Sequence, residues 1–315
     1  MDWSHFGADR PAFRPAVDPS AYYPAHSHEA ARHALGSAFA RREPVVLVDG
    51  ETGVGKSLVA RKWLDDLMPL VPRVVLPTAR AERAADLLQA ILFDMGKPYA
   101  GMSEQELRLA VTGHLLDAAA GGFPTVVVLD EAQALSHEAL EELRTLFNLE
   151  ARGASAVFAV LVAHPMLRDA FRRAAYGLIA DRVSVRCAVE ALSAEDSVAY
   201  LCHQLRAAGA NPERVLEDGA AALLAAACRG VPRVLNRAAA TAFELAHAAG
   251  AGCVDVEAAV GALEQLEIAA PDDGSDAEAE APAVLALPAR EKAAEGNERG
   301  AARGSKEKVA RRRTV

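Results

Sequence analysis

Short apolar runs separated by longer amphipathic segments fill the first 190 residues of the chain. The apolar runs, which predict β-strands, are Val45–Asp49, Val74–Pro77, Thr125–Leu129, Val157–Val162 and Arg182–Arg186. The run Thr125–Leu129 is continuous and β-branched, as is typical of a strand buried on both faces of a sheet. The segments around them predict helices over residues 28–42, 57–70, 80–95, 103–119 and 136–150. Strands that alternate with helices indicate an α/β fold with a parallel sheet.

The strand pattern stops after residue 190. Ser193 and Asp196 form a capping signal that starts a predicted helix, and apolar residues recur at helical spacing behind it. Further helices are expected over residues 213–229, 231–249 and 255–267. An all-α unit therefore follows the α/β unit.

A glycine-rich turn joins the first predicted strand to the next helix. It reads Gly50-Glu51-Thr52-Gly53-Val54-Gly55-Lys56-Ser57, and Leu58 continues the helix. This is the G-x-x-x-x-G-K-[ST] phosphate-binding pattern in its required strand–turn–helix context. Glycines let the backbone approach a phosphate, and successive N–H groups form a cradle for the anion. We expect residues 50–58 to bind ATP, with Lys56 on the β- and γ-phosphates and the Ser57 hydroxyl on Mg²⁺.

Two acidic residues, Asp130 and Glu131, end the third predicted strand. In a P-loop protein this strand end lies beside the nucleotide. We therefore expect Asp130 to hold Mg²⁺ and Glu131 to orient and deprotonate the attacking water. A further polar group is expected at the tip of the strand that lies between the first and the third predicted strands. His164 follows that strand and could contact the γ-phosphate or the water. Thr78, at the end of the second strand, could hold Glu131 in an inactive pose.

Arg182 and Arg233 are candidates for stabilising the charge that develops on the transferred phosphoryl group. Arg233 lies in Gly230-Val-Pro-Arg233, at the start of a helix of the all-α unit, and could reach the nucleotide across the domain cleft. Arg182 comes just before the last strand and could point toward a neighbouring subunit.

The two ends of the chain differ in composition from the rest. Residues 1–27 are rich in proline and aromatic side chains, so we expect them to pack on the edge of the core or to form a lip over the nucleotide base. From Pro271 onward, alanine, glutamate, glycine and proline dominate. The sequence thus predicts an N-terminal segment (1–27), an α/β ATPase core (28–190), a helical lid (191–268) and a disordered tail, first acidic and then basic (269–315).

Net charge, cysteine spacing and the length of the apolar runs limit the kinds of protein that this chain could be. The formal net charge is −9, which does not suggest a broad nucleic-acid-binding face, although a local basic patch remains compatible with it. The four cysteines form no C-x-x-C pair and fit core thiols in a reducing compartment. The N-terminus does not read as a signal peptide, and no apolar run is long enough for a membrane span. We expect a cytoplasmic protein.

Taken in order, the motifs resemble those of AAA+ ATPases of the general secretion pathway protein A (ExeA-like) type, which are related to transposon target-selection ATPases. The resemblance covers residues 1–265. The motifs that carry it are Trp3-x-x-Phe6-Gly7, Tyr22-Tyr23, Gly50–Ser57, Val128-Leu-Asp-Glu-Ala-Gln133, Leu161-Val-Ala-His-Pro165, Arg182-Val and Gly230-Val-Pro-Arg233-x-x-Asn236.

The resemblance implies a three-layer α/β ATPase core with a helical lid. It implies that Arg233 is the sensor-2 arginine, that Arg182 is an arginine finger acting in trans, and that His164 lies in the sensor-1 neighbourhood. The family usually carries Gly-Gln where this chain has Ala163-His164. Family members in secretion also carry a membrane span and a periplasmic peptidoglycan-binding part, and the printed sequence has neither.

The motifs and the resemblance together predict an AAA+ ATPase that hydrolyses ATP with Mg²⁺ and drives a conformational change on an unknown protein partner. We expect a homo-oligomer, because one arginine would come from a neighbour. One alternative is an ATP-dependent regulator that binds double-stranded DNA, as in transposition target selection. Another is a nucleotide-switched scaffold with little turnover, which an intact Glu131 disfavours.

Overall fold

Five parallel strands form the central sheet of the computed structural model, which describes residues 1–14, 18–69, 71–76 and 78–269. The predicted tail lies outside the described residues except for residue 269. The strands are β1 (Val45–Asp49), β2 (Arg73–Leu76), β3 (Thr125–Leu129), β6 (Val157–Ala163) and β7 (Val183–Ala188). Their order across the sheet is β2-β3-β6-β1-β7, and each neighbouring pair is parallel. This confirms the predicted α/β fold with a parallel sheet.

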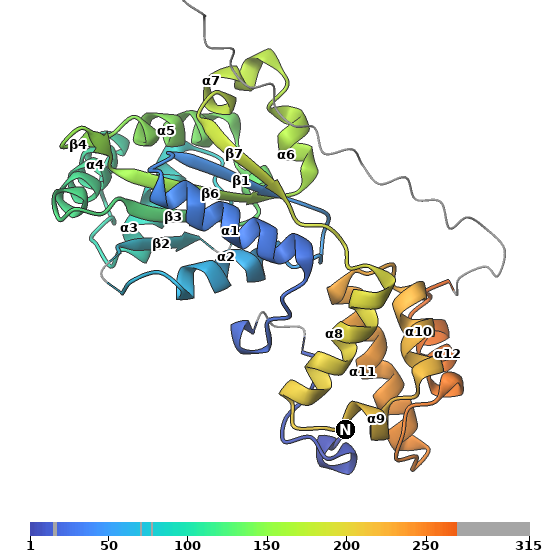
Figure 1. Cartoon of the computed structure of the whole chain (residues 1–315). Coiled ribbons are helices and arrows are strands. Elements are labelled where there is room, and N and C mark those ends of the chain that lie inside the picture. Colours follow the sequence, from blue (N-terminus) through green and yellow to red (C-terminus); the bar gives the residue numbers. More distant parts are fainter. Residues whose placement is uncertain (15–17, 70, 77, 270–315) are drawn as a thin grey trace, which may run out of the picture. The chain divides into compact units, whose positions relative to one another are not determined.

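Helices cover both faces of the sheet, which makes three layers (Figure 1). Alternate residues of one strand serve different faces. Val46 and Val48 of β1 pack with α1 (His26–Ala40) and α2 (Lys56–Asp65), whereas Val45 and Leu47 belong to the cluster on the other face. The helices that contribute to that other face include α3 (Ala84–Asp94), α4 (Glu104–Ala120), α5 (His137–Phe147) and α7 (Gly177–Ala180).

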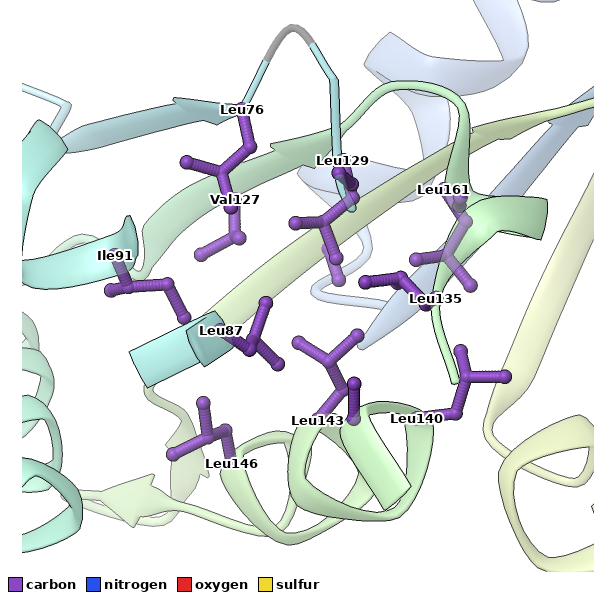
Figure 2. Packing of buried hydrophobic residues seen from close by; sticks show 14 of the residues in the cluster. Leu76, Leu87, Ile91, Val127, Leu129, Leu135, Leu140, Leu143, Leu146 and Leu161 are labelled. Carbon is purple, nitrogen blue, oxygen red and sulfur yellow. The ribbon is translucent and has the colours of Figure 1, made fainter. Parts of the chain in front are cut away.

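Leucine side chains dominate this second face. In Figure 2, Val127 and Leu129 of β3 point toward Leu87 of α3 and Leu143 of α5, and all four are at most 3% exposed. Burial of four such side chains contributes on the order of 1.5–3 kcal/mol each. The sheet is therefore a rigid platform, and the loops at its carboxyl edge are held in place by it.

The strand order brings three separate chain segments to one edge of the sheet. β6 lies between β1 and β3, with Leu47 opposite Leu161 and Leu129 opposite Leu161 on the other side. Because all three strands run in the same direction, the residues that follow them meet at the carboxyl edge. The predicted position of β6 between the other two strands is thus confirmed.

After β7 the described part of the chain forms five helices, which we call the helical unit. They are α8 (Ala194–Ala207), α9 (Pro212–Val215), α10 (Asp218–Ala227), α11 (Pro232–Ala248) and α12 (Val256–Gln265). It has its own hydrophobic cluster. Contacts group the described residues into one compact unit, so the predicted boundary between core and lid at residue 190 stays a prediction.

The N-terminal segment packs on the helical unit. Trp3, Phe6 and Phe13 surround Phe243 of α11, with ring centroids 4.9–5.7 Å away. Arg10 also donates to the carbonyl oxygen of Ala207. The aromatic side chains of the segment therefore divide: Trp3, Phe6 and Phe13 pack on the cluster of the helical unit, whereas Tyr22 packs against the α/β core, as expected of the segment.

Several element boundaries differ from the sequence-based prediction. The predicted helix over 213–229 is two helices, α9 and α10, because Leu216 is extended and bridges Val254. A short antiparallel pair, β4 (Glu150–Ala151) with β5 (Ala154–Ser155), was not predicted. α3 begins at Ala84 instead of residue 80. At Ala84, the backbone N–H donates to a carboxylate oxygen of Glu138 at 2.8 Å.

A 3-10 turn (Ala132–Ala134) and the helix α6 (Pro165–Ala170) complete the loops at the carboxyl edge of the sheet. Among the described residues, no helix combines the length and the apolar character that crossing a bilayer requires.

Candidate nucleotide site

The phosphate-binding loop runs from the end of β1 to the start of α2, as predicted. Gly53 and Gly55 have φ values of 87° and 106°, which residues with a side chain rarely adopt. A Cβ atom on Gly53 would lie 2.9 Å from the Cβ of Arg233. The loop therefore needs glycine at both positions, and it leads directly into the N-terminus of a helix, which favours an anion.

Lys56, the first residue of α2, folds back over its own loop. Its Nζ donates to the carbonyl oxygens of Gly50 (2.8 Å) and Glu51 (2.7 Å). Burial lowers the pKa of the Lys56 ammonium, while the carboxylates of Glu131, Asp130 and Glu51 oppose that shift. The positive charge is thus held at the mouth of the loop, where a phosphate would replace the carbonyl oxygens as its partner.

The two predicted Mg²⁺ ligands lie together. Burial raises the pKa of the Asp130 carboxyl, and the neighbouring Ser57 side chain is the main influence that opposes this shift. A hydroxyl and a carboxylate are the hard oxygen donors that Mg²⁺ prefers, with phosphate oxygens and water completing its shell. The donor set at Ser57 and Asp130 therefore fits Mg²⁺ bound with a nucleotide.

A chain of hydrogen bonds crosses the carboxyl edge of the sheet. Glu131 has φ 57°, an uncommon value for a residue with a side chain, and its Oε2 accepts from Nε2 of Gln133 at 2.6 Å. The Oε1 of the same Gln133 accepts from the backbone N–H of His164 at 2.9 Å. Gln133 thus fixes Glu131 relative to the tip of β6, a role that sequence reasoning missed although Gln133 belongs to the Asp-Glu-Ala-Gln string.

His164 links this chain to the phosphate-binding loop. Its Nδ1 accepts from the Met166 N–H at 3.3 Å, so in the neutral ring the proton is on Nε2, which lies 2.9 Å from Oε2 of Glu51. The structure therefore brings His164 to the loop, and its contact with the γ-phosphate or the water stays a prediction. It does not join Thr78 to Glu131: within the described residues, the hydrogen bonds of the Glu131 side chain involve Gln133 and not Thr78.

Asp49, the last residue of β1, is a second residue that sequence reasoning missed. It is 2% exposed, and its Oδ2 lies 2.9 Å from Nη1 of Arg168 on α6, an ion pair whose angles do not make a hydrogen bond. Burial raises the pKa of the Asp49 carboxyl, with Arg168, Arg186 and Lys56 opposing the shift. The only sequence signal was an acidic residue at the end of an otherwise apolar strand.

The two candidate arginines lie in different places. Arg233 is at the N-terminus of α11, and its backbone N–H donates to the carbonyl oxygen of Gly53 at 3.2 Å. Arg182 precedes β7, at the opposite edge of the sheet, beside a second hollow that Arg42 and Glu150 also line. Only Arg233 therefore belongs to the site of its own chain.

A cavity of about 800 Å³ opens from the phosphate-binding loop toward the helical unit. Lys56, Ser57, Glu131 and Arg233 line it, together with residues of the N-terminal segment from Arg10 to Arg14. Its volume lies in the ordinary range for a small-molecule site. This is the position in which the expected lip over a nucleotide base would lie, and that role stays a prediction.

Comparison with known proteins agrees with this geometry. Residues 40–171 match the family model described as "AAA domain". The chain is 32% identical over 234 residues to General secretion pathway protein A of Aeromonas hydrophila; the match covers 73% of this chain and 42% of that protein. The chain thus spans about two fifths of the length of this relative.

Solved structures share the fold. The Aeropyrum pernix ORC2 protein in ADPNP–ADP complexes superposes with a TM-score of 0.66 at 17% identity, covering 82% of this chain and 72% of that one. The Aeropyrum pernix ORC1 protein in complex with DNA gives 0.63 at 20%, covering 82% and 70%, and Cdc6p of Pyrobaculum aerophilum gives 0.63 at 15%, covering 84% and 71%.

The phosphate-binding loop, the strand order and the matched family model all lead to the same assignment. Residues 40–171 match the AAA domain model, the chain shares its fold with the ORC and Cdc6 structures, and it is similar to General secretion pathway protein A.

Proposed function

We propose that this chain is an ATPase that hydrolyses ATP with Mg²⁺. The observation that carries the proposal is the meeting of Lys56, the Ser57–Asp130 pair and Glu131 around one glycine-rich loop at the carboxyl edge of the sheet. Each is the residue type that phosphoryl transfer to water requires at that place. The similar Aeropyrum pernix ORC2 protein was solved in ADPNP–ADP complexes, which is consistent with a nucleotide ligand for this chain.

Each residue would have a distinct part in the reaction. Glu131 accepts a proton from water while the water oxygen bonds to the γ-phosphorus and the bond to the ADP oxygen breaks. Lys56 and Arg233 stabilise the negative charge on the γ-phosphate oxygens. Ser57 and Asp130 would hold Mg²⁺, which would supply positive charge next to the β- and γ-phosphates. His164, joined to Glu51 and to Gln133, is placed to sense the γ-phosphate.

The same proposal extends to the whole chain. Residues 28–190 would act as the ATPase core and residues 191–268 as the lid, whose movement acts on a protein partner. Arg182 would complete the site of a neighbouring copy, so activity would need a homo-oligomer. The cytoplasm, which supplies ATP and Mg²⁺, is the compartment we propose.

The test is ATP turnover of the wild type and of Glu131→Gln, each with and without double-stranded DNA. Glu131→Gln keeps the size and polarity of the side chain but cannot take the proton. We expect turnover to fall by about 10²–10⁴-fold while ATP still binds. Glu82→Gln, which changes an exposed glutamate away from the loop, is the matched control and should keep wild-type turnover.

DNA decides between the proposal and its first alternative. Stimulation of the wild type by DNA would favour the DNA-binding regulator, a reading supported by the similar fold of ORC1 in complex with DNA. ATP turnover that is the same with and without DNA would favour the proposal of a protein partner. A wild type that binds ATP but shows no turnover, even at high protein concentration, would replace the hydrolase with the nucleotide-switched scaffold.

A further inference from the structure

A buried histidine supports the phosphate-binding loop from behind. His28, the third residue of α1, is 4% exposed, and its Nε2 lies 2.8 Å from the carbonyl oxygen of Val54 in the loop. A carbonyl oxygen can only accept a hydrogen bond, so Nε2 of His28 carries the proton and donates it. α1 therefore reaches across to the loop through one defined contact.

The surroundings of His28 favour a neutral ring in that tautomer. The Ser27 Oγ lies 3.4 Å from Nδ1 and can donate to it, and the ring of Tyr22 stands edge-on with its centroid 6.5 Å away. Burial lowers the pKa of the His28 imidazole, which outweighs the opposing effects of the Val54 carbonyl and of Asp196 and Glu29.

The contact determines which way one peptide unit of the loop faces. Among the described residues all peptide bonds are trans, and in a trans peptide the C=O and N–H groups point in opposite directions. With the Val54 carbonyl directed at His28, the Gly55 N–H must point away from α1. Within the described part of the chain that N–H has no protein acceptor, and Gly55 lines the cavity beside Lys56 and Ser57.

Gly55 also explains why the orientation needs support. At φ 106° it is a glycine with freedom to rotate, so the Val54–Gly55 peptide could turn over and present a carbonyl oxygen to an anion. A Cβ atom on Gly55 would lie 2.7 Å from Nε2 of His28, so the imidazole packs directly against this residue.

We propose that His28 is a positioning residue that holds the Val54–Gly55 peptide with its N–H toward a phosphate of the bound nucleotide. This inference rests on the proposed nucleotide binding. It assigns a role in the site to α1, an element that lies before the phosphate-binding loop in the sequence and has no part in its motif.

The test measures the Kd for ADP by titration for the wild type and three variants. His28→Ala removes ring and donor, and His28→Phe keeps a ring without the donor. Both should weaken ADP binding about tenfold or more, since the lost contact controls a hydrogen bond to a charged group. His28→Gln, which keeps an N–H donor at the position of Nε2, should recover part of the loss. His33→Ala, an exposed histidine of the same helix, should bind ADP as the wild type does.

Two results would overturn the inference. One is wild-type ADP affinity in His28→Phe, with the midpoint of thermal unfolding of the free protein as a check on folding. If His28→Ala fails to fold, the comparison of His28→Phe with His28→Gln still decides, because a purely structural role would favour the ring over the donor.

The second result that would overturn the inference does not depend on nucleotide binding. A long-range ¹H–¹⁵N correlation spectrum of the free protein should show His28 protonated on Nε2 and not on Nδ1. The opposite tautomer would rule out the contact. A wild type that binds no ADP would instead refute the proposed function, so the two failures are distinguishable.

Discussion

At the scale of single residues, Asp49 places a carboxyl group in a buried part of the sheet. It ends β1 with 4% of its side chain exposed, while its partner Arg168 is 40% exposed. An ion pair that is half in water contributes little, whereas removing a carboxylate from water costs several kcal/mol. The raised pKa of the Asp49 carboxyl is the result, with burial as its largest cause.

We predict that Asp49→Asn stabilises the free protein at pH 7. Because the pKa is higher in the folded state than in the unfolded state, the folded state binds more protons between the two values. Stability therefore falls as pH rises through the folded-state pKa. The variant should gain on the order of 1 kcal/mol, or roughly 2–4 °C in Tm, and the gain should shrink as the pH is lowered and the wild-type carboxyl becomes neutral.

Thermal unfolding of wild type and variant over a pH series measures this difference. Arg168→Ala is the comparison, because it removes the attraction and should lower stability at pH 7 with a loss that also shrinks in acid. An Asp49→Asn protein that is less stable than the wild type at pH 7 would mean that the ion pair outweighs the burial.

Individual residues differ in how far the sequence predicts their place. The sequence predicted residues 50–58, Asp130 and Glu131 because a local motif specifies them and the phosphate chemistry explains them. Asp49, His28 and Gln133 were not predicted as parts of the site. Asp49 pairs with Arg168, which lies far along the chain, and His28 itself has no motif that links it to Val54 of the loop. No spacing rule connects such pairs.

At the scale of elements, the connection between β7 and the helical unit is fixed at both ends. The Val189 N–H donates to the carbonyl oxygen of Asp49, and the Leu192 N–H donates to that of Gly230, both at 2.8 Å. Gly230 has φ 69° and precedes α11, whose Arg233 contacts the phosphate-binding loop. The connection thus ties the end of β1 to the start of α11.

Gly230→Ala should break this connection. A Cβ atom there would overlap the carbonyl oxygen and carbon of Leu192, which are backbone atoms and cannot move aside. Gly250 follows the other end of α11 at φ 73° with open space around the position, which makes it a matched control. Gly250→Ala should cost about 1–2 kcal/mol from backbone strain alone. Gly230→Ala should cost roughly 4 kcal/mol because the overlap is added.

Chemical denaturation of the two variants measures both free energies. Equal losses would show that the connection shifts easily to admit a side chain, and that the helical unit is not tied to the loop in this way.

The sequence predicted the type of most elements and fewer of their boundaries. Ser103 and Ser136 begin helices as predicted because the capping residues are local signals. The break at Leu216 and the start of α3 depend on Val254 and Glu138, which lie elsewhere in the chain. Tertiary contacts decided those boundaries, and periodicity alone does not contain them.

At the scale of the whole molecule, the apolar runs of the sequence were enough to predict the α/β layers. The distance of Arg182 from the candidate nucleotide site, however, depends on the register of the strands. Val183 of β7 lies opposite Val45, the first residue of β1, whereas the phosphate-binding loop starts after Asp49. Five strand residues span about 17 Å. An arginine side chain does not cover that distance, so Arg182 is out of reach of the loop of its own chain.

Under the proposed function, Arg182 can therefore contribute to hydrolysis only in another copy, which gives the last prediction. Arg182→Ala should turn over ATP about 10³-fold more slowly than the wild type while binding it normally. Mixing it with equal amounts of Glu131→Gln should restore turnover, since sites with an intact Glu131 then receive Arg182 from the neighbouring copy. Random pairing in a closed ring would complete roughly one quarter of the sites. Arg206→Ala, an exposed arginine of α8, is the control and should keep wild-type turnover. Wild-type activity of Arg182→Ala alone would exclude it as the finger, and a mixture as inactive as its components would argue against donation between copies.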